Sequence, residues 1–155
     1  MRLIRNPNAW SCMLASTAMV LDTTIKDLIK EIGHDGGKII FPELPEPARR
    51  RGFHIQEFVP LILKSGFAMT PIEVLPCSTP DGQHQFNIPL GDYELRFWKL
   101  VGVNMGIFTG KMRKWHHAVA WDGARIYDPS RGICYSHDCN LQIDCFYRFD
   151  QIKSF

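Results

Sequence analysis

The stretch from residue 117 to residue 128 reads His-Ala-Val-Ala-Trp-Asp-Gly-Ala-Arg-Ile-Tyr-Asp. Asp122-Gly123 is a dipeptide typical of a two-residue hairpin turn, and strand-like runs flank it on both sides. With these two residues as the turn, His117 lies directly opposite Asp128. Directly opposed side chains have Cβ atoms roughly 5 Å apart, which lets a carboxylate reach an imidazole nitrogen. The stretch therefore predicts a β-hairpin that holds a His–Asp pair.

Two histidines stand side by side at the start of this hairpin, and strand geometry separates them. Successive side chains of a strand point to opposite faces, so His117 shares a face with Val119 and Trp121. The side chain of His116 then points to the other face. His117 is therefore the candidate base, and His116 is not.

Far upstream, a cysteine stands at the start of the first apolar run. Residues 11–22 read Ser-Cys-Met-Leu-Ala-Ser-Thr-Ala-Met-Val-Leu-Asp, with apolar residues near helical spacing. Ser11 suits the N-cap position, which places Cys12 in the first helical turn. Free backbone N–H groups and the positive end of the helix dipole there favour thiolate over thiol. Alternatively, Cys12 is a small apolar residue of a core helix, since free cysteines are often buried.

Together the two segments resemble the active-site segments of papain-like cysteine peptidases. The run Asn-Pro-Asn-Ala-Trp-Ser-Cys at residues 6–12 resembles the nucleophile segment, and the end of the hairpin at Asp128-Pro129 resembles the His…Asp-Pro hairpin. The similarity is greatest to the bacteriocin-processing branch, the double-glycine leader peptidases, and to small stand-alone peptidase-like proteins of phages. The resemblance implies an α+β fold. Its N-terminal helical part carries the cysteine and packs on a C-terminal antiparallel sheet that carries the histidine and the acid.

The resemblance also implies a role for each residue. Cys12 is the expected nucleophile, His117 the general base and Asp128 the acid that orients the ring. Asn6 stands where the family has a Gln that supplies an oxyanion-hole amide, and Met13 stands where the family often has Gly. The reaction is acyl transfer through a thioester to water, on a protein or peptide substrate and without a cofactor. Losing one oxyanion donor typically lowers turnover by on the order of a hundredfold.

Three functions remain open from the sequence. The first is a cysteine peptidase or isopeptidase with a Cys-His-Asp triad. The second is a catalytically weak or inactive peptidase-like protein that acts as a protein-binding module, as the residues at positions 6 and 13 suggest. The third is acyl transfer to an amine instead of water, for which the chain offers no cofactor-binding motif.

Length and composition indicate one domain over residues 1–155, because 155 residues with 45% hydrophobic content are enough for one sizeable core. A net charge of +2 is too small to indicate nucleic-acid binding. No apolar run approaches the roughly 20 residues of a membrane span, and the N-terminus lacks a secretory apolar region. We therefore expect a cytoplasmic protein that does not bind membranes. Five cysteines without an export signal are expected to be reduced.

A cluster near the C-terminus offers four potential zinc ligands within twelve residues: Cys134, His137, Cys139 and Cys145. Its spacing fits none of the common zinc patterns, which have paired ligands at both ends. Alternation from Cys139 to Cys145 is instead typical of a strand with buried thiols. We therefore expect no metal site.

Periodicity and breaker residues predict helices first and strands later. We expect helices within residues 11–22 and at 25–32, 47–51, 56–65 and around 93–101, strands at 67–75, 103–108, 115–121, 124–127 and 141–149, and surface loops at 34–45 and 76–91.

Overall fold

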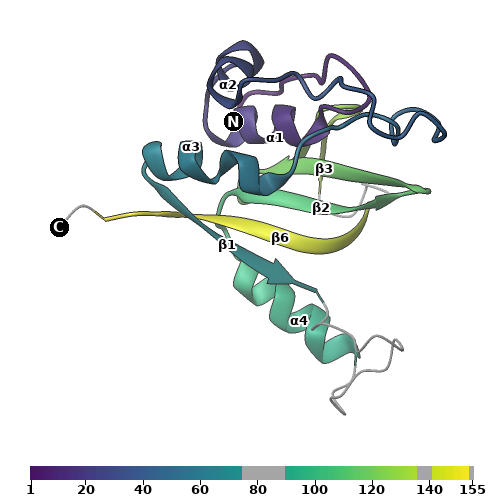
Figure 1. Cartoon of the computed structure of the whole chain (residues 1–155). Coiled ribbons are helices and arrows are strands. Elements are labelled where there is room, and N and C mark those ends of the chain that lie inside the picture. The colour runs from purple at the N-terminus through teal and green to yellow at the C-terminus, as the bar shows by residue number, and fades with distance from the viewer. Residues whose placement is uncertain (75–89, 136–140, 154–155) are drawn as a thin grey trace.

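A six-stranded antiparallel sheet divides the chain into two layers of helices in the computed structural model (Figure 1). The structure describes residues 1–74, 90–135 and 141–153. The order across the sheet is β1-β6-β2-β3-β4-β5. The strands are β1 (Phe67–Glu73), β2 (Gly106–Met112), β3 (Trp115–Trp121), β4 (Arg125–Asp128), β5 (Gly132–Tyr135) and β6 (Gln142–Gln151).

The helices of the described residues lie on both faces of this sheet. The bounds are α1 (Cys12–Val20), α2 (Ile25–Ile32), the 3-10 helix η1 (Ile55–Phe58), α3 (Val59–Lys64) and α4 (Leu90–Val101). Figure 1 shows α1, α2 and α3 together on one face and α4 alone on the other. The α+β class predicted from the sequence is confirmed.

The first two helices begin where the sequence predicts, directly after Ser11 and directly after Thr24. Ser11 is the N-cap residue of α1, although its hydroxyl makes no hydrogen bond to the helix. At α2 the hydroxyl of Thr24 accepts a hydrogen bond from the Asp27 backbone N–H at 3.1 Å. Gly33 ends α2 with a φ of 89°, the left-handed conformation that glycine adopts without strain.

Each face of the sheet has its own apolar core. Towards α1–α3 the buried residues include Leu14, Ala18, Phe58, Ile62, Ile107, Ala118 and Ala120. Towards α4 they include Phe97, Val101, Phe108, Val119, Trp121 and Phe146. Burying a large apolar side chain contributes about 1.5–3 kcal/mol, so both layers hold the sheet in place. The strand β3 contributes to both cores, which fixes its position firmly.

The β3–β4 hairpin forms, but with a different turn from the one expected. Trp121 lies opposite Ile126, so the central turn residues are Gly123 and Ala124. Gly123 has a φ of 101°, as the first central position of such a turn requires. The side chain of Asp122 accepts hydrogen bonds from the two backbone N–H groups of residues 124 and 125, at 2.9 and 2.7 Å, and so belongs to the strand end. The register is shifted by two residues, which preserves the face on which each side chain lies.

Several element predictions are confirmed. Pro60 lies in the first turn of α3, where a missing N–H costs nothing. Pro71 lies in β1, which is an edge strand. The strand predicted at 115–121 has these bounds, and the strand predicted at 141–149 is β6.

Other element predictions are wrong. Residues 46–49 form turns and not a helix, because this segment pairs across a long loop through the Ile39–Arg50 bridge. The strand expected at 103–108 starts only at Gly106, since Asn104 still hydrogen-bonds back to the end of α4. The sequence prediction missed β5. The loop expected at 76–91 lies outside the described residues except for its end, which is the start of α4.

The cysteines differ from the expectation that all are reduced. Cys12 and Cys145 are free, whereas Cys134 is disulfide-bonded. None of the helices in the described ranges has the length and apolar character needed to cross a membrane. Residence in the cytoplasm stays a prediction.

Candidate active site

The structure brings His117 and Asp128 together, as the sequence predicted. Nε2 of His117 lies 2.9 Å from Oδ1 of Asp128. Because of the shifted turn, continuing the register places Asp128 opposite Val119, so the pair is diagonal. Diagonal neighbours on one face lie roughly 7–8 Å apart, which an imidazole spans. The predicted contact between His117 and Asp128 is present, but the prediction that the two residues lie directly opposite each other is wrong.

Asp128 is fully buried and holds a fixed orientation. Its exposed fraction is 0%. Oδ1 also accepts a hydrogen bond from the backbone N–H of Ser130 at 2.8 Å. Burial opposes ionisation, but the hydrogen bond and positive charge of His117 outweigh it and hold the pKa of Asp128 below its ordinary value. Oδ2 has no hydrogen-bond partner among the described residues. Asp128 is therefore a buried charged group that the Ser130 backbone N–H holds against His117.

The thiol of Cys12 is the second group that acts on His117, close enough to the ring to favour its charged form. Since Asp128 occupies Nε2, Nδ1 is the ring nitrogen left for the sulfur. Burial disfavours the imidazolium, but the hydrogen bonds to Asp128 and Cys12 and the charges of both groups raise the pKa of His117 to about 9. The ring is therefore protonated at neutral pH when it lies between an acid and a thiolate. The imidazole on β3 thus joins two groups, Cys12 of α1 and Asp128 of β4.

Hydrogen bonds between the N-terminal segment and the residues that follow β4 hold this arrangement together. The backbone N–H of Asn6 donates to the carbonyl of Pro129 at 3.2 Å, and Arg5 donates to the carbonyl of Ser130 at 3.1 Å. On α1, the hydroxyl of Ser16 donates to the carbonyl of Ala118 in β3 at 3.2 Å. The helix that carries Cys12 is therefore attached to the strand that carries the histidine, one residue from it.

Asn8 organises the loop that precedes the cysteine, a role that the sequence prediction missed. Its Oδ1 accepts hydrogen bonds from the backbone N–H of Trp10, at 3.3 Å, and from the hydroxyl of Ser11. An asparagine that accepts from the N–H two residues ahead forms an Asx-turn. An asparagine shortly before the start of a helix is the sequence signal from which this role of Asn8 could have been predicted. The Ser11 hydroxyl serves this loop and leaves the first N–H groups of α1 free.

The expected oxyanion residue, Asn6, is half-buried, and its amide is partly engaged. Its Nδ2 donates to the carbonyl of Asn8 at 2.8 Å. An amide nitrogen carries two hydrogens, so one remains for another acceptor. The backbone N–H of Cys12 makes no hydrogen bond within the described part of the chain. Each of these two groups therefore has an N–H that the described residues leave available for an acceptor.

His116, Cys134 and Cys145 are not part of this site. His116 is exposed. Cys134 is disulfide-bonded, and burial raises the pKa of the Cys145 thiol, so neither presents a thiolate ligand for zinc. His137 and Cys139 lie outside the described residues. Within the described ranges no three His, Cys, Asp or Glu residues lie together as metal ligands would.

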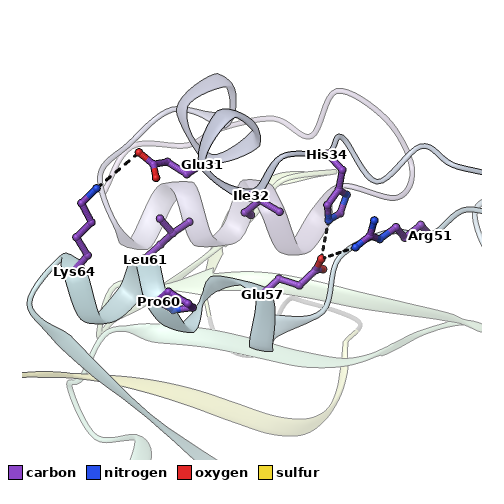
Figure 2. Close-up of a pocket in the computed structure, with 8 residues that line it drawn as sticks. All are labelled: Glu31, Ile32, His34, Arg51, Glu57, Pro60, Leu61 and Lys64. Carbon is purple, nitrogen blue, oxygen red and sulfur yellow. Dashed lines mark hydrogen bonds and ion pairs between the residues drawn. The ribbon is translucent and has the colours of Figure 1, made fainter.

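A separate hollow of about 440 Å³ lies between α2 and the η1–α3 segment (Figure 2). In its wall, Glu57 accepts from Nε2 of His34 at 2.7 Å and from Arg51 at 3.2 Å. Nδ1 of His34 accepts from the backbone N–H of Gly36 at 3.0 Å, so both ring nitrogens are occupied. At the other end Lys64 lies 3.8 Å from Glu31. The polar groups satisfy one another, which indicates that they fasten the loop after α2 to η1.

No protein-family model matches the chain, and no curated protein matches it.

Proposed function

We propose that this protein is a papain-like cysteine hydrolase that cleaves a peptide or isopeptide bond. The observation that carries the proposal is the position of His117, which contacts the Cys12 thiol on one side and the buried Asp128 on the other. An imidazole placed between a thiol and a fixed carboxylate is the arrangement that activates a sulfur nucleophile. The attachment of a cysteine-bearing helix to an antiparallel sheet further supports the papain-like assignment.

The proposed reaction has two steps. In the resting site His117 has taken the proton of the Cys12 thiol, and the thiolate attacks the carbonyl carbon of the scissile bond. The imidazolium then gives its proton to the leaving amine, so the C–N bond breaks and a thioester remains on the sulfur. In the second step His117 removes a proton from water, whose oxygen attacks the thioester. The acid product leaves, and the sulfur departs as a thiolate beside the imidazolium, which restores the resting site.

Asp128 has a positioning role in both steps. Its negative charge stabilises the imidazolium, and its hydrogen bond keeps Nδ1 of His117 directed at the sulfur. The oxyanion that forms at the carbonyl is held by the backbone N–H of Cys12 and by the free N–H of the Asn6 amide. The start of α1 adds favourable potential for that negative charge.

Labelling of the thiols tests the nucleophile. Iodoacetamide is expected to modify Cys12 much faster than Cys145, whose buried thiol has a raised pKa. Peptide mapping by mass spectrometry identifies the modified residue. Cys12→Ala should remove the fast labelling and all cleavage of a peptide library, whereas Cys145→Ala should keep both. Fast labelling that survives in Cys12→Ala would refute the assignment.

One observation favours the second function, a peptidase-like binding module. The Asn6 amide is shorter than the Gln that the family has there, and it already donates to the Asn8 carbonyl. If this limits turnover, Asn6→Gln should raise cleavage by about tenfold or more, because a full oxyanion donor contributes on the order of a hundredfold. If neither form cleaves the library while Cys12 stays reactive, the binding module becomes the better description.

A further inference from the structure

The tip of the β2–β3 hairpin carries three positive side chains at the end of the strand that presents His117. Lys111, Arg113 and Lys114 are exposed. Lys111 is the cross-strand partner of His116, so its side chain starts on the face of the sheet opposite that of His117, and Arg113 and Lys114 form the turn itself. Lys114 precedes β3, three residues from His117, which at about 3.3 Å per residue is roughly 10 Å along the strand. The strand that presents the proposed base therefore also presents a cationic tip.

These cations lack acidic partners among the described residues. Several arginines of the described part of the chain do form ion pairs: Arg50 with Glu46, Arg51 with Glu57, Arg125 with Asp122 and Arg148 with Asp150. No carboxylate in the described residues pairs with the hairpin tip, where the one side-chain contact is Lys114 over the ring of Trp115 at 5.2 Å. On β6, next to β2, the carboxylate of Asp144 accepts a hydrogen bond from Thr109 instead.

The tip is held in a defined shape, so its charges are presented together. Met112 pairs with Trp115, which leaves Arg113 and Lys114 as a two-residue turn. Arg113 has a φ of 58°, in the left-handed region that this kind of turn requires. A rigid group of like charges on a narrow hairpin raises the local concentration of anionic ligands.

We propose that the hairpin tip formed by Lys111, Arg113 and Lys114 binds a carboxylate-rich segment of the peptide or protein substrate. The inference rests on the proposed function and adds the substrate class to it. An extended peptide rises by about 3.3 Å per residue, so the acidic residues would lie about three residues from the scissile bond. Aspartate and glutamate side chains there meet ammonium and guanidinium groups that have no competing partner.

Fluorescence anisotropy with fluorescein-labelled hexaglutamate tests the tip without any need for turnover. The variant K111S/R113N/K114S removes the three charges, with Asn at position 113 because it tolerates the left-handed backbone. At about 20 mM salt, where screening is weak, its Kd should rise roughly tenfold or more, the combined effect of three modest ion pairs. The control K26S/K30S/K153S removes the same net charge from exposed sites elsewhere and should stay within about twofold of the wild type.

Further arms separate this proposal from the proposed function. K111R/K114R keeps the charges and should bind as the wild type does, and Cys12→Ala should bind equally well, because the tip does not use the sulfur. Bound hexaglutamate should also slow the iodoacetamide labelling of Cys12, which places the tip beside the site. If the wild type cleaves no peptide but binds hexaglutamate, and the hairpin variant loses that binding, the peptidase proposal is refuted and the binding of an acidic ligand by the tip is kept.

Three results would overturn the hairpin proposal. The first is an equal loss of binding in the hairpin variant and in the control, which would mean that only net charge matters. The second is binding of hexaglutamate that leaves Cys12 labelling unchanged. The third is an oligothymidylate of equal charge that binds as tightly as hexaglutamate, which would make the tip a general polyanion site.

Discussion

Replacing Asp128 by asparagine removes the charge next to His117 and leaves the shape of the site almost unchanged. Oδ1 of Asp128 accepts hydrogen bonds from both His117 and the Ser130 backbone N–H, so the oxygen of an asparagine is expected to take the same place. Its nitrogen then occupies the position of Oδ2, which has no hydrogen-bond partner among the described residues. The variant therefore tests the charge and not the geometry.

The expected magnitude follows from the pKa of His117. The ring has a pKa of about 9, against an ordinary value of 6.5, with Asp128 as the first of the groups that raise it. That difference corresponds to about 3 kcal/mol in favour of the imidazolium. Removing the negative charge should lower the pKa of His117 by about one to two pH units, with the contribution of Cys12 remaining. Turnover should fall because the imidazolium formed during the reaction loses its counter-charge.

An NMR titration of the histidine ring nitrogens measures this directly. The titration of His117 should move to lower pH in Asp128→Asn, and the alkaline limb of the cleavage profile should move with it. Asp150→Asn is the matched control, since it removes a carboxylate that pairs with Arg148 in the same sheet. An unchanged titration of His117 in Asp128→Asn would show that the carboxylate does not set the charge state of the ring, and the reasoning would fail.

The same pKa predicts how stability depends on pH. A group whose pKa is raised by folding stabilises the native state fully below its unfolded pKa and loses that effect as the pH rises through the folded pKa. For His117 the free energy of unfolding should therefore fall between pH 6.5 and about 9, by roughly 3 kcal/mol at most. Urea unfolding at several pH values measures the slope. In Asp128→Asn the free energy of unfolding should depend less steeply on pH. If the free energy of unfolding of the wild type does not change with pH in this range, the His117–Asp128 ion pair is contradicted.

Three further changes test the supports of the site by urea unfolding. Asn8→Ala removes the acceptor of two hydrogen bonds and should lower the free energy of unfolding by about 1–3 kcal/mol, whereas Asn8→Asp keeps the acceptor and should cost less. Glu57→Gln should cost about 1–2 kcal/mol at pH 7 and little at pH 3. Burial raises the pKa of Glu57, but hydrogen bonds from the His54 backbone and from His34 outweigh this effect and hold the pKa below its ordinary value. The stabilising effect of the Glu57 carboxylate is therefore lost as the pH falls through that pKa. Gly123→Ala should cost roughly 2 kcal/mol, since its Cβ would lie 2.5 Å from a backbone oxygen at a φ of 101°, and an unchanged midpoint would contradict the turn.

Local pattern alone was enough for the first two helices and most strands. Ser11 before an apolar run placed the start of α1, and Thr24 and Gly33 bounded α2 at both ends, because caps and glycine breaks act over three or four residues. Period-two alternation placed His117 and His116 on different faces of β3, and His116 is indeed exposed. The choice of Cys12, His117 and Asp128 also came from the sequence, through a family resemblance, and their catalytic roles stay predictions.

What the tertiary structure decided depends on contacts between distant residues. The turn of the hairpin moved by one residue because the Asp122 side chain binds the N–H groups of residues 124 and 125, which a dipeptide signal does not encode. The attachment of Asn6 to Pro129 joins segments more than a hundred residues apart. The elevated pKa of His117 exists only when a thiol and a carboxylate meet at one ring and together outweigh the opposing effect of burial. The sequence by itself therefore determined which groups are chemically suited to one another, and packing decided that they meet.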